Sequence, residues 1–549
     1  MSSRPCPSAA TKNYYTPPAS FPALYPYLCS RIIQKSMPTT SENNKRIAKN
    51  TLLLYMRMIF LMLISLYTSR VVLNALGVEN YGIYSVVGGV VAMFTVVSGS
   101  LSGAISRFIT FELGKGDKYK LKRVFSTSVT IQMGMSLVFV IIAETAGLWF
   151  LNTMMNIPED RMYAANWVLQ FSIITFVVNL INVPYNATII AHERMSAFAY
   201  ISILEAVCKL SVALLISVSP IDKLIFYGIL LMATSLLIRL TYGIYCKRNF
   251  EECTYNFTLD KPLLKKMTSF AGWNFFGSVC SMFNNQGVNM LMNIYFDVTV
   301  NAARGVAGQV NGAISQFINS FTMAVNPQIT KSYASGDYDY MYKLICRSTK
   351  FSSFLMLLIA VPFVLEAQTV LEIWLKNPPE YAVIFAQLSI FTSIINYVWG
   401  NALLTGMMAT GNIKKYVFVI SACGFVVFPV TWICYALSLP PQSFYVAFII
   451  VYCFILWVRL RFMKSILHHS IKRFVIDVYG RIIPIMALAF VIPLILRQSM
   501  TPGILRLVCV CLVSVPVTAA LSYYLGMTTN EKLFIKEKVK SKITSKFKY

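Results

Sequence analysis

The sequence of 549 residues has little charge, and most of that charge is of one sign. Only 13% of its residues are charged, with 22 acidic side chains against 48 basic ones, whereas 56% are hydrophobic and the mean hydropathy is +0.61. Soluble domains carry about 25% charged residues. The shortage of charge therefore excludes an ordinary soluble globular protein and indicates a chain that lies largely within a membrane.

Motifs that bind nucleotides or metals are also missing. The sequence has no G-x-x-x-x-G-K-[ST] phosphate-binding loop, so we do not expect ATP to drive its activity. Its twelve cysteines show no zinc or redox spacing, and the pair His468-His469 in a basic loop is a poor basis for a metal site. We expect no metal and no cofactor, and a gradient of protons or sodium ions is the energy source that stays open.

A cleavable signal peptide is not recognisable either. Residues 1–36 are rich in proline and lack an apolar stretch of about 7–15 residues followed by a cleavage site. We expect residues 1–44 to form a disordered N-terminal extension, with Met37 as the true start of translation.

Long hydrophobic runs fill most of the remaining chain. About 20 apolar residues are needed to cross the hydrocarbon layer of a membrane. Fourteen runs meet this length, near residues 51–76, 83–110, 124–150, 163–190, 197–218, 224–246, 268–295, 298–326, 350–375, 382–410, 414–438, 442–460, 476–497 and 501–526. The sequence therefore predicts an all-α polytopic membrane protein with fourteen transmembrane helices.

The first six spans and the next six are related by a shift of 220 residues. Without a gap, the identical pairs are Val86 and Val306, Gly88 and Gly308, Val90 and Val310, Ser100 and Ser320, Ala104 and Ala324, Ile109 and Ile329, Thr110 and Thr330, Gly116 and Gly336, Asp117 and Asp337, and Ser128 and Ser348; Arg239-Leu240 falls on Arg459-Leu460. Each unit has an even number of helices, so the pseudo-two-fold axis relating the two six-helix lobes runs along the membrane normal. Such a doubled unit is typical of transporters.

The distribution of basic residues predicts how the chain is oriented. They gather in alternate loops, such as 111–123 and 247–267, and the intervening loops are nearly bare. This positive-inside pattern places both termini in the cytoplasm and argues against nucleic acid as a partner of the basic charge. The expected division is an extension at 1–44, an N-lobe at 45–246, a cytoplasmic linker at 247–267, a C-lobe at 268–462, two further spans at 463–526 and a basic tail at 527–549.

Span eight carries an unusual number of polar residues on one face. These residues recur at steps of three and four, which puts them in a stripe about 80° wide along the helix. They are Asn301, Arg304, Gly308, Asn311, Ser315, Asn319, Thr322 and Asn326. Polar groups are costly against lipid, so this stripe faces protein or water. We favour a hydrated cavity, with Asn285 and Asn289 of span seven beside it, and hydrogen bonding between packed helices is the alternative.

Other residues within the spans are candidates for the same cavity. Arg304 ranks first for binding an anion, followed by Arg57, Arg70 and Arg107, because a guanidinium matches phosphate oxygens bidentately. Tyr81 and Tyr84 offer ring faces to sugars, and an interfacial position is the alternative.

Carboxylates within the spans are candidates for carrying a coupling ion. These are Glu144, Glu205 and Glu366, of which Glu144 and Glu366 are expected near solvated outer ends. Glu205 has a simpler alternative role, because Lys209 lies four residues on and can neutralise it on one helix face.

Two segments resemble the polysaccharide repeat-unit flippases, the O-antigen and capsule branch of the multidrug/oligosaccharidyl-lipid/polysaccharide (MOP) exporter superfamily. They are Leu76-Gly77-x-Glu79-x-Tyr81-Gly82-x-Tyr84, and the stretch from Ala303-Arg304-Gly305 through Asn326-Pro327-Gln328-Ile329 to Gly336-Asp337. The resemblance covers residues 45–526, and the leading 36 residues depart from the family.

The resemblance implies two lobes facing each other across a cationic cavity in a bacterial inner-membrane protein. The implied substrate is an undecaprenyl-pyrophosphate-linked oligosaccharide, an O-antigen, capsular or exopolysaccharide repeat unit, moved from the cytoplasmic to the outer leaflet by alternating access coupled to an ion gradient. The arginines at 57, 70, 107 and 304 match the family's basic positions approximately. Implied partners are this lipid-linked oligosaccharide and membrane lipid, with a glycan polymerase and glycosyltransferases. The protein is expected to be a transporter rather than an enzyme, and to be a monomer.

Three other functions stay open. A cation-coupled drug or metabolite antiporter of the same superfamily would have acidic residues dominating its cavity, whereas the charge on the central stripe is Arg304. A membrane polymerase or ligase of glycans is opposed by the short outward loops and the doubled lobes. A peptidoglycan-precursor flippase is not distinguished by the sequence.

Overall fold

The computed structural model describes residues 40–92, 95–153, 157–256, 260–296, 298–467, 470–529 and 531–533. The chain divides into two compact units, 1–49 and 50–549, and all packing reported below lies within the second. Most of the predicted N-terminal extension, the pair His468-His469 and nearly all of the basic tail lie outside the described residues. The predicted boundaries between the parts of the chain stay predictions.

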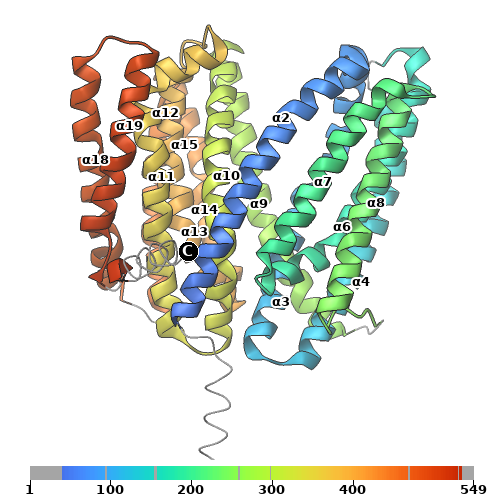
Figure 1. Ribbon diagram of the computed structural model, residues 1–549, viewed down its shortest axis with the longest axis horizontal. Coiled ribbons are helices and arrows are strands. Elements are labelled where there is room, and N and C mark those ends of the chain that lie inside the picture. The colour runs from blue at the N-terminus through green and yellow to red at the C-terminus, as the bar shows by residue number, and fades with distance from the viewer. Residues whose placement is uncertain are drawn as a thin grey trace, which may run out of the picture. The chain divides into compact units, whose positions relative to one another are not determined.

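Most of the described residues are helical, and none of them forms a strand (Figure 1). The first lobe contains α2 (Thr40–Ala92), α3 (Thr95–Lys115), α4 (Lys118–Ile142), η1 (Ala143–Gly147), α5 (Leu148–Thr153), α6 (Glu159–Ala191), α7 (Met195–Leu215), η2 (Ile216–Val218) and α8 (Lys223–Asn249). The second contains α9 (Lys261–Tyr295), α10 (Val298–Ala334), α11 (Tyr338–Leu375), α12 (Ala382–Ser393), η3 (Ile394–Val398), α13 (Trp399–Thr410), α14 (Lys414–Phe425), α15 (Val427–Ala436) and α16 (Ser443–Leu467). The C-terminal segment adds α17 (Ile471–Phe474), η4 (Val475–Tyr479), α18 (Gly480–Ser499), α19 (Ile504–Leu521) and η5 (Ser522–Gly526).

The predicted all-α membrane fold is confirmed, and each predicted span corresponds to a helix or to adjoining helices. Several spans are broken by a short π-helical turn, such as η3 between α12 and α13. The predicted loop after the first span is instead a sharp kink within α2. Gly77 has φ 80° and ψ 164°, a left-handed value that glycine adopts without the steric penalty of a Cβ atom.

Eleven helices or helical runs among the described residues are long and apolar enough to cross a membrane. Three helices in predicted span positions, α3, α9 and α10, are not among them. Their low hydropathy reflects the polar residues of spans two, seven and eight. These three helices also pack against one another, α3 against both α9 and α10. The least apolar spans therefore meet where the two lobes join.

The predicted repeat has a structural counterpart at the turn that follows α3 and α10. Gly116 and Gly336 both have left-handed backbones, with φ of 74° and 82°. The next residue in each case caps the following helix: Asp117 Oδ1 accepts from the backbone N–H of residue 120, and Asp337 Oδ1 from that of residue 340, both at 3.0 Å. Identical residues thus build the same glycine turn and N-cap 220 positions apart.

Each lobe has its own apolar core. In the first lobe α6 packs on α8, α3 and α4, and in the second α10 packs on α11, α12 and α13. Fully buried side chains such as Val168 and Phe385 lie in these cores. The C-terminal pair α18 and α19, drawn in red in Figure 1, packs on α11 at the edge of the second lobe.

Candidate functional site

A cavity of about 820 Å³ lies between α9 and α10, and we call it the Arg304 cavity. Its polar and small lining residues are Asn285, Asn289, Asn293, Asn301, Arg304 and Gly308. They recur at steps of three and four, so the helical period brings them to one face of each helix. None of the described residues that line this cavity is acidic.

Arg304 is held at the cavity wall by neutral groups of α9. Its Nη1 donates to the backbone oxygen of Asn285 at 3.1 Å and to Oδ1 of Asn289, and its guanidinium lies 4.9 Å from the ring centre of Phe444. Asn301 keeps a buried Oδ1 with no hydrogen-bond partner among the described residues. Neutral partners leave the guanidinium charge uncancelled, so this cavity is suited to an anionic ligand.

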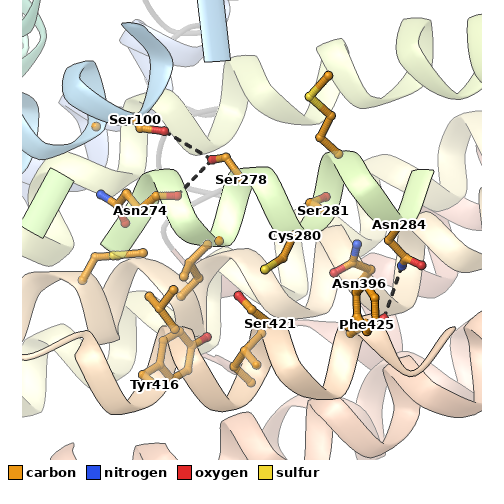
Figure 2. Close-up of a pocket in the computed structure, with 18 of the residues that line it drawn as sticks. Ser100, Asn274, Ser278, Cys280, Ser281, Asn284, Asn396, Tyr416, Ser421 and Phe425 are labelled. Atoms are coloured by element: carbon orange, nitrogen blue, oxygen red, sulfur yellow. Dashed lines mark hydrogen bonds between the residues drawn. The ribbon is translucent and has the colours of Figure 1, made fainter. Parts of the chain in front are cut away.

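A second cavity of about 800 Å³ adjoins the first, and we call it the Arg459 cavity. It lies between α9 and α14, with α3, α13, η3 and α16 completing its wall. In Figure 2, the labelled polar side chains of α9 lie opposite Tyr416 and Ser421 of α14, and Ser278 Oγ lies 3.3 Å from Ser100 Oγ on α3. Asn285 lines both cavities, so the two follow one another along α9.

A third, smaller cavity of about 350 Å³ lies inside the first lobe, and we call it the Glu205 cavity. Its lining includes Tyr84, Asn182, Asn186 and Glu205. The side-chain oxygens of both asparagines are buried without a hydrogen-bond partner among the described residues. Tyr84 therefore lines an intralobe cavity, where its ring meets that of Tyr227 edge to face at 4.9 Å.

The middle of the predicted polar stripe on α10 is engaged in helix packing. Ser393 Oγ of α12 donates to Asn311 Oδ1 at 2.6 Å. The backbone oxygen of Asn319 accepts from Thr322 Oγ1 at 3.1 Å, and Thr322 is buried. Asn301 and Arg304 thus line a cavity, whereas Asn311 makes the interhelical hydrogen bond that was the alternative reading. Direct contact of Asn311 and Asn319 with a ligand stays a prediction.

The structure gives the three described members of the predicted set, Arg57, Arg107 and Arg304, different surroundings. Arg57 on α2 lies 4.4 Å from the ring centre of Phe198 on α7, a contact within the first lobe. The buried Arg107 donates to the last carbonyls of α13, Met408 O at 3.2 Å and Ala409 O at 2.7 Å. A cation at a helix C-terminus is stabilised by the helix dipole. The side chains of the fourth predicted arginine, Arg70, and of the predicted sugar contact Tyr81 lie outside the described residues.

The three predicted coupling carboxylates have different surroundings. Glu144 accepts from Gln170 Nε2 at 3.0 Å, and Glu205 pairs with Lys209 at 2.6 Å while lining its cavity. Glu366 was expected near a solvated end, but it is fully buried and pairs with Arg506 of α19 at 2.8 Å. That ion pair attaches the C-terminal helices to α11. The two residues are far apart in the sequence, so their pairing could not be predicted from it.

Beside the basic loops the two lobes are joined by a buried ion pair. Glu193, in the turn between α6 and α7, has a fully buried side chain whose Oε1 lies 2.6 Å from Lys331 Nζ of α10. Its Oε2 accepts from Gln328 Nε2, also at 2.6 Å. Its backbone has φ 58°, uncommon for a glutamate, and its carbonyl accepts from Asn50 Nδ2 at 3.3 Å. Such strain persists where the surroundings hold the residue in place.

Further contacts between the lobes lie at the same end of α3 and α10. Phe108 and Phe111 of α3 meet Phe270 and Tyr333, with ring centres 5.6 and 6.3 Å apart. Gly114 lies so close to α10 that a Cβ atom there would approach Ala334 Cβ to 2.8 Å. Together with the contacts that Glu193 makes with Lys331 and that Arg107 makes with α13, these residues join the two lobes beside the basic loops.

Sequence reasoning missed Glu193 and Arg459. Glu193 lies in a short turn, and only its backbone conformation and the approach of the other lobe distinguish it. Arg459 was visible as the repeat partner of Arg239, a signal that could have marked both for attention. Arg239 stacks 3.9 Å from the ring centre of Tyr185, whereas Arg459 lines a cavity.

Comparisons with known proteins fit this architecture. The profile of a family described as "Polysaccharide biosynthesis protein" matches residues 47–333. No curated protein matches the sequence at a significant level.

Solved transporters share the fold at low sequence identity. An outward-facing multidrug resistance MATE family transporter of the MOP superfamily is 11% identical, with a TM-score of 0.67 over 78% of this chain and 97% of that one. A MATE in the bent conformation, also 11% identical, has a TM-score of 0.69 over 80% and 99%. A MOP superfamily transporter from Pyrococcus furiosus Vc1, described as having a binding pocket of reverse polarity that suggests a different function, is 12% identical, with a TM-score of 0.64 over 78% and 97%.

Proposed function

Because the chain belongs to the polysaccharide biosynthesis protein family and has the fold of the MOP-superfamily transporters, we propose that it is a lipid-linked oligosaccharide flippase. The cargo is an undecaprenyl-pyrophosphate-linked repeat unit of O-antigen, capsule or exopolysaccharide. It moves from the cytoplasmic to the outer leaflet of the bacterial inner membrane, and both termini of the protein lie in the cytoplasm. The glycan polymerase and glycosyltransferases that make and use this cargo are the expected partners of a monomeric protein.

The observation that carries this proposal is the chemistry of the Arg304 cavity. A pyrophosphate needs donors and positive charge, which Arg304 offers bidentately, and sugar hydroxyls need amide partners, which the surrounding asparagines offer. The cavity's volume of about 820 Å³ falls in the range of about 300–1,000 Å³ that is typical of ligand pockets. The polyprenyl chain stays in lipid, where burying it involves no polar cost.

The contacts beside the basic loops support alternating access. If those loops are cytoplasmic, the described conformation is closed toward the cytoplasm, and loading requires Glu193 to release Lys331 and Arg107 to release α13. All these bonds join a residue of one lobe to a residue of the other: Glu193 bonds the Lys331 side chain, and Arg107 bonds backbone carbonyls of α13. A movement of the two lobes about their common axis would break them together.

Charge is the property that opposes the antiporter alternative. A drug or metabolite cation would favour acidic lining residues, and the described residues lining the Arg304 and Arg459 cavities include none. The shared MATE-like fold does not decide between these substrates, because one fold serves many functions.

We place the coupling ion in the Glu205 cavity. Glu205 lines a polar cavity whose two asparagine oxygens are unpartnered among the described residues, whereas Glu366 is occupied by Arg506. A proton or sodium ion arriving at Glu205 competes with Lys209 for its carboxylate. Replacing Glu205 with glutamine should make transport independent of the pH or sodium gradient that drives the wild type; a retained gradient dependence would move the coupling site elsewhere.

The test of the proposed function is deletion of the gene followed by analysis of lipid-linked sugars on the inner side of the membrane. We expect the repeat unit to accumulate, and complementation with Arg304→Ala to reduce export by roughly ten- to hundredfold, since a hydrogen bond to a charged group contributes about 1.5–3 kcal/mol. Arg461→Ala, at an exposed position on α16, is the control and should export normally. Accumulation of a peptidoglycan precursor, or drug sensitivity with normal lipid-linked sugars, would overturn the assignment.

A further inference from the structure

The Arg459 cavity contains buried polar atoms that nothing in the described structure satisfies. Arg459 is only 8% exposed, and its Nε has no hydrogen-bond partner among the described residues. The same holds for the hydroxyl of Tyr416, 1% exposed, and for Oδ1 of the buried Asn284. All three residues line the cavity. Buried donors and acceptors without partners are unfavourable, particularly on a charged group, so their clustering indicates a polar ligand.

Helix packing explains only part of the Arg459 side chain. Its Nη1 donates to the backbone oxygen of Asn396 at 3.1 Å, within the π-helical turn η3. A π-helical turn alters the regular hydrogen-bond ladder, so an outside donor at this carbonyl is understandable. A guanidinium has five N–H donors, however, and this bond accounts for one of them.

The charge of Arg459 is also uncancelled within its cavity. It is the one charged side chain among the described residues that line this space, and the other polar groups are neutral amides and hydroxyls, including Asn274, Ser278 and Ser421. The repeat-related Arg239 instead lies over the ring of Tyr185. Of the two matched arginines, Arg459 is therefore the one placed to meet a ligand.

We infer that the Arg459 cavity is a second binding site for the phosphate-bearing headgroup of a polyprenyl-linked lipid. Arg459 and Tyr416 bind phosphate oxygens, while the amides and hydroxyls of α9 bind sugar. Because Asn285 lines both cavities, the headgroup passes along α9 between Arg304 and Arg459 without leaving polar surroundings. The inference rests on the proposed function for the identity of the lipid.

The test measures binding of undecaprenyl pyrophosphate to the full-length protein in nanodiscs of neutral phosphatidylcholine, by native mass spectrometry. Arg459→Lys keeps a donor for Asn396 but loses the guanidinium fork, and Tyr416→Phe keeps the ring that meets Phe462 at 5.3 Å. We expect each to weaken binding roughly tenfold, the effect of losing one hydrogen bond to a charged group. Arg239→Lys, the repeat-matched control, should bind as the wild type does.

Parallel arms identify the source of the phosphate and separate the two proposals. Undecaprenol should not compete, and phosphatidylglycerol should compete at least tenfold more weakly than the pyrophosphate lipid; equal competition would make the cavity a phospholipid site and overturn the inference. Wild-type binding by both Arg459→Lys and Tyr416→Phe, with binding lost in Arg304→Ala, would also overturn it while leaving the proposed function intact. Failure of the wild type to bind the pyrophosphate lipid would count against the function itself.

Discussion

Replacing Glu193 with glutamine should open the molecule beside the basic loops. The native carboxylate is fully buried, bonds Lys331 Nζ and Gln328 Nε2 at 2.6 Å each, and joins the first lobe to α10 of the second. Glutamine has nearly the same shape, so the turn can keep its packing. It lacks the negative charge to which Lys331 Nζ and Gln328 Nε2 donate. The NH₂ group of its amide would also face one of these two donors and could not accept its hydrogen bond.

The magnitude follows from the two lost charge-assisted bonds. Each contributes about 1.5–3 kcal/mol, and neutral bonds to the amide restore about half of the sum. The closed state is then destabilised by about 1.5–3 kcal/mol relative to an open one, a change of about 10- to 150-fold in their ratio. A closed state favoured a hundredfold would become comparable in population to the open state.

Double electron–electron resonance between spin labels measures this change directly. Tyr119 and Asp339 are exposed, related by the repeat, and lie at the starts of α4 and α11 in opposite lobes, so Tyr119→Cys and Asp339→Cys, with reactive native cysteines removed, provide the label sites. We expect Glu193→Gln to add a population at longer distance. Glu531→Gln is the matched control, because its buried bond to Lys350, 2.9 Å long, does not join the lobes. An unchanged distance distribution in folded Glu193→Gln would refute the reasoning.

Three further outcomes follow from particular contacts. Gly114→Ala should shift the spin-label distances in the same direction, since a Cβ atom there would lie 2.8 Å from atoms of α10. Arg506→Ala should lower the free energy of unfolding, measured by thermal denaturation of the purified protein, by about 3–5 kcal/mol, because it leaves the fully buried Glu366 without its ion-pair partner. Protection from hydrogen exchange around Glu252 should fall only in acid. Burial opposes ionisation of Glu252, but the hydrogen bond with His192, a backbone hydrogen bond and the charge of Lys118 together hold its pKa below the usual value. The stabilisation is therefore present above the unfolded pKa and is lost as the pH falls through the folded one.

Each of these outcomes has a control. Gly134→Ala on α4, where an added Cβ meets no atom within 4 Å, should leave the distances unchanged. The double replacement of Arg506 and Glu366 by leucine should recover much of the lost stability, since an apolar pair removes the unpaired charge. Exchange near residue 252 that instead rose between pH 7 and 6 would show that the carboxylate is not the titrating group.

The sequence alone was sufficient for the architecture, because lipid imposes simple rules on a chain. Helices satisfy their own backbone hydrogen bonds in the membrane, so apolar length located most of the spans, and the shift of 220 residues predicted the two lobes. The twin turns at Gly116 and Gly336 follow from identical residues. The polar faces of spans seven and eight also followed from spacing, and Arg304 with its asparagines lies on one cavity.

Tertiary structure decided which of these polar residues meet a cavity and which meet another helix. Spacing fixes the face of a helix but not the neighbour that covers it, so Asn311 bonds Ser393 while Arg304, two turns away on the same stripe, lines open space. The pairing of Glu193 with Lys331, and the cavity around Arg459, depend on how α3, α9 and α10 come together between the lobes. Those contacts join residues far apart in the chain, whose approach no local pattern records.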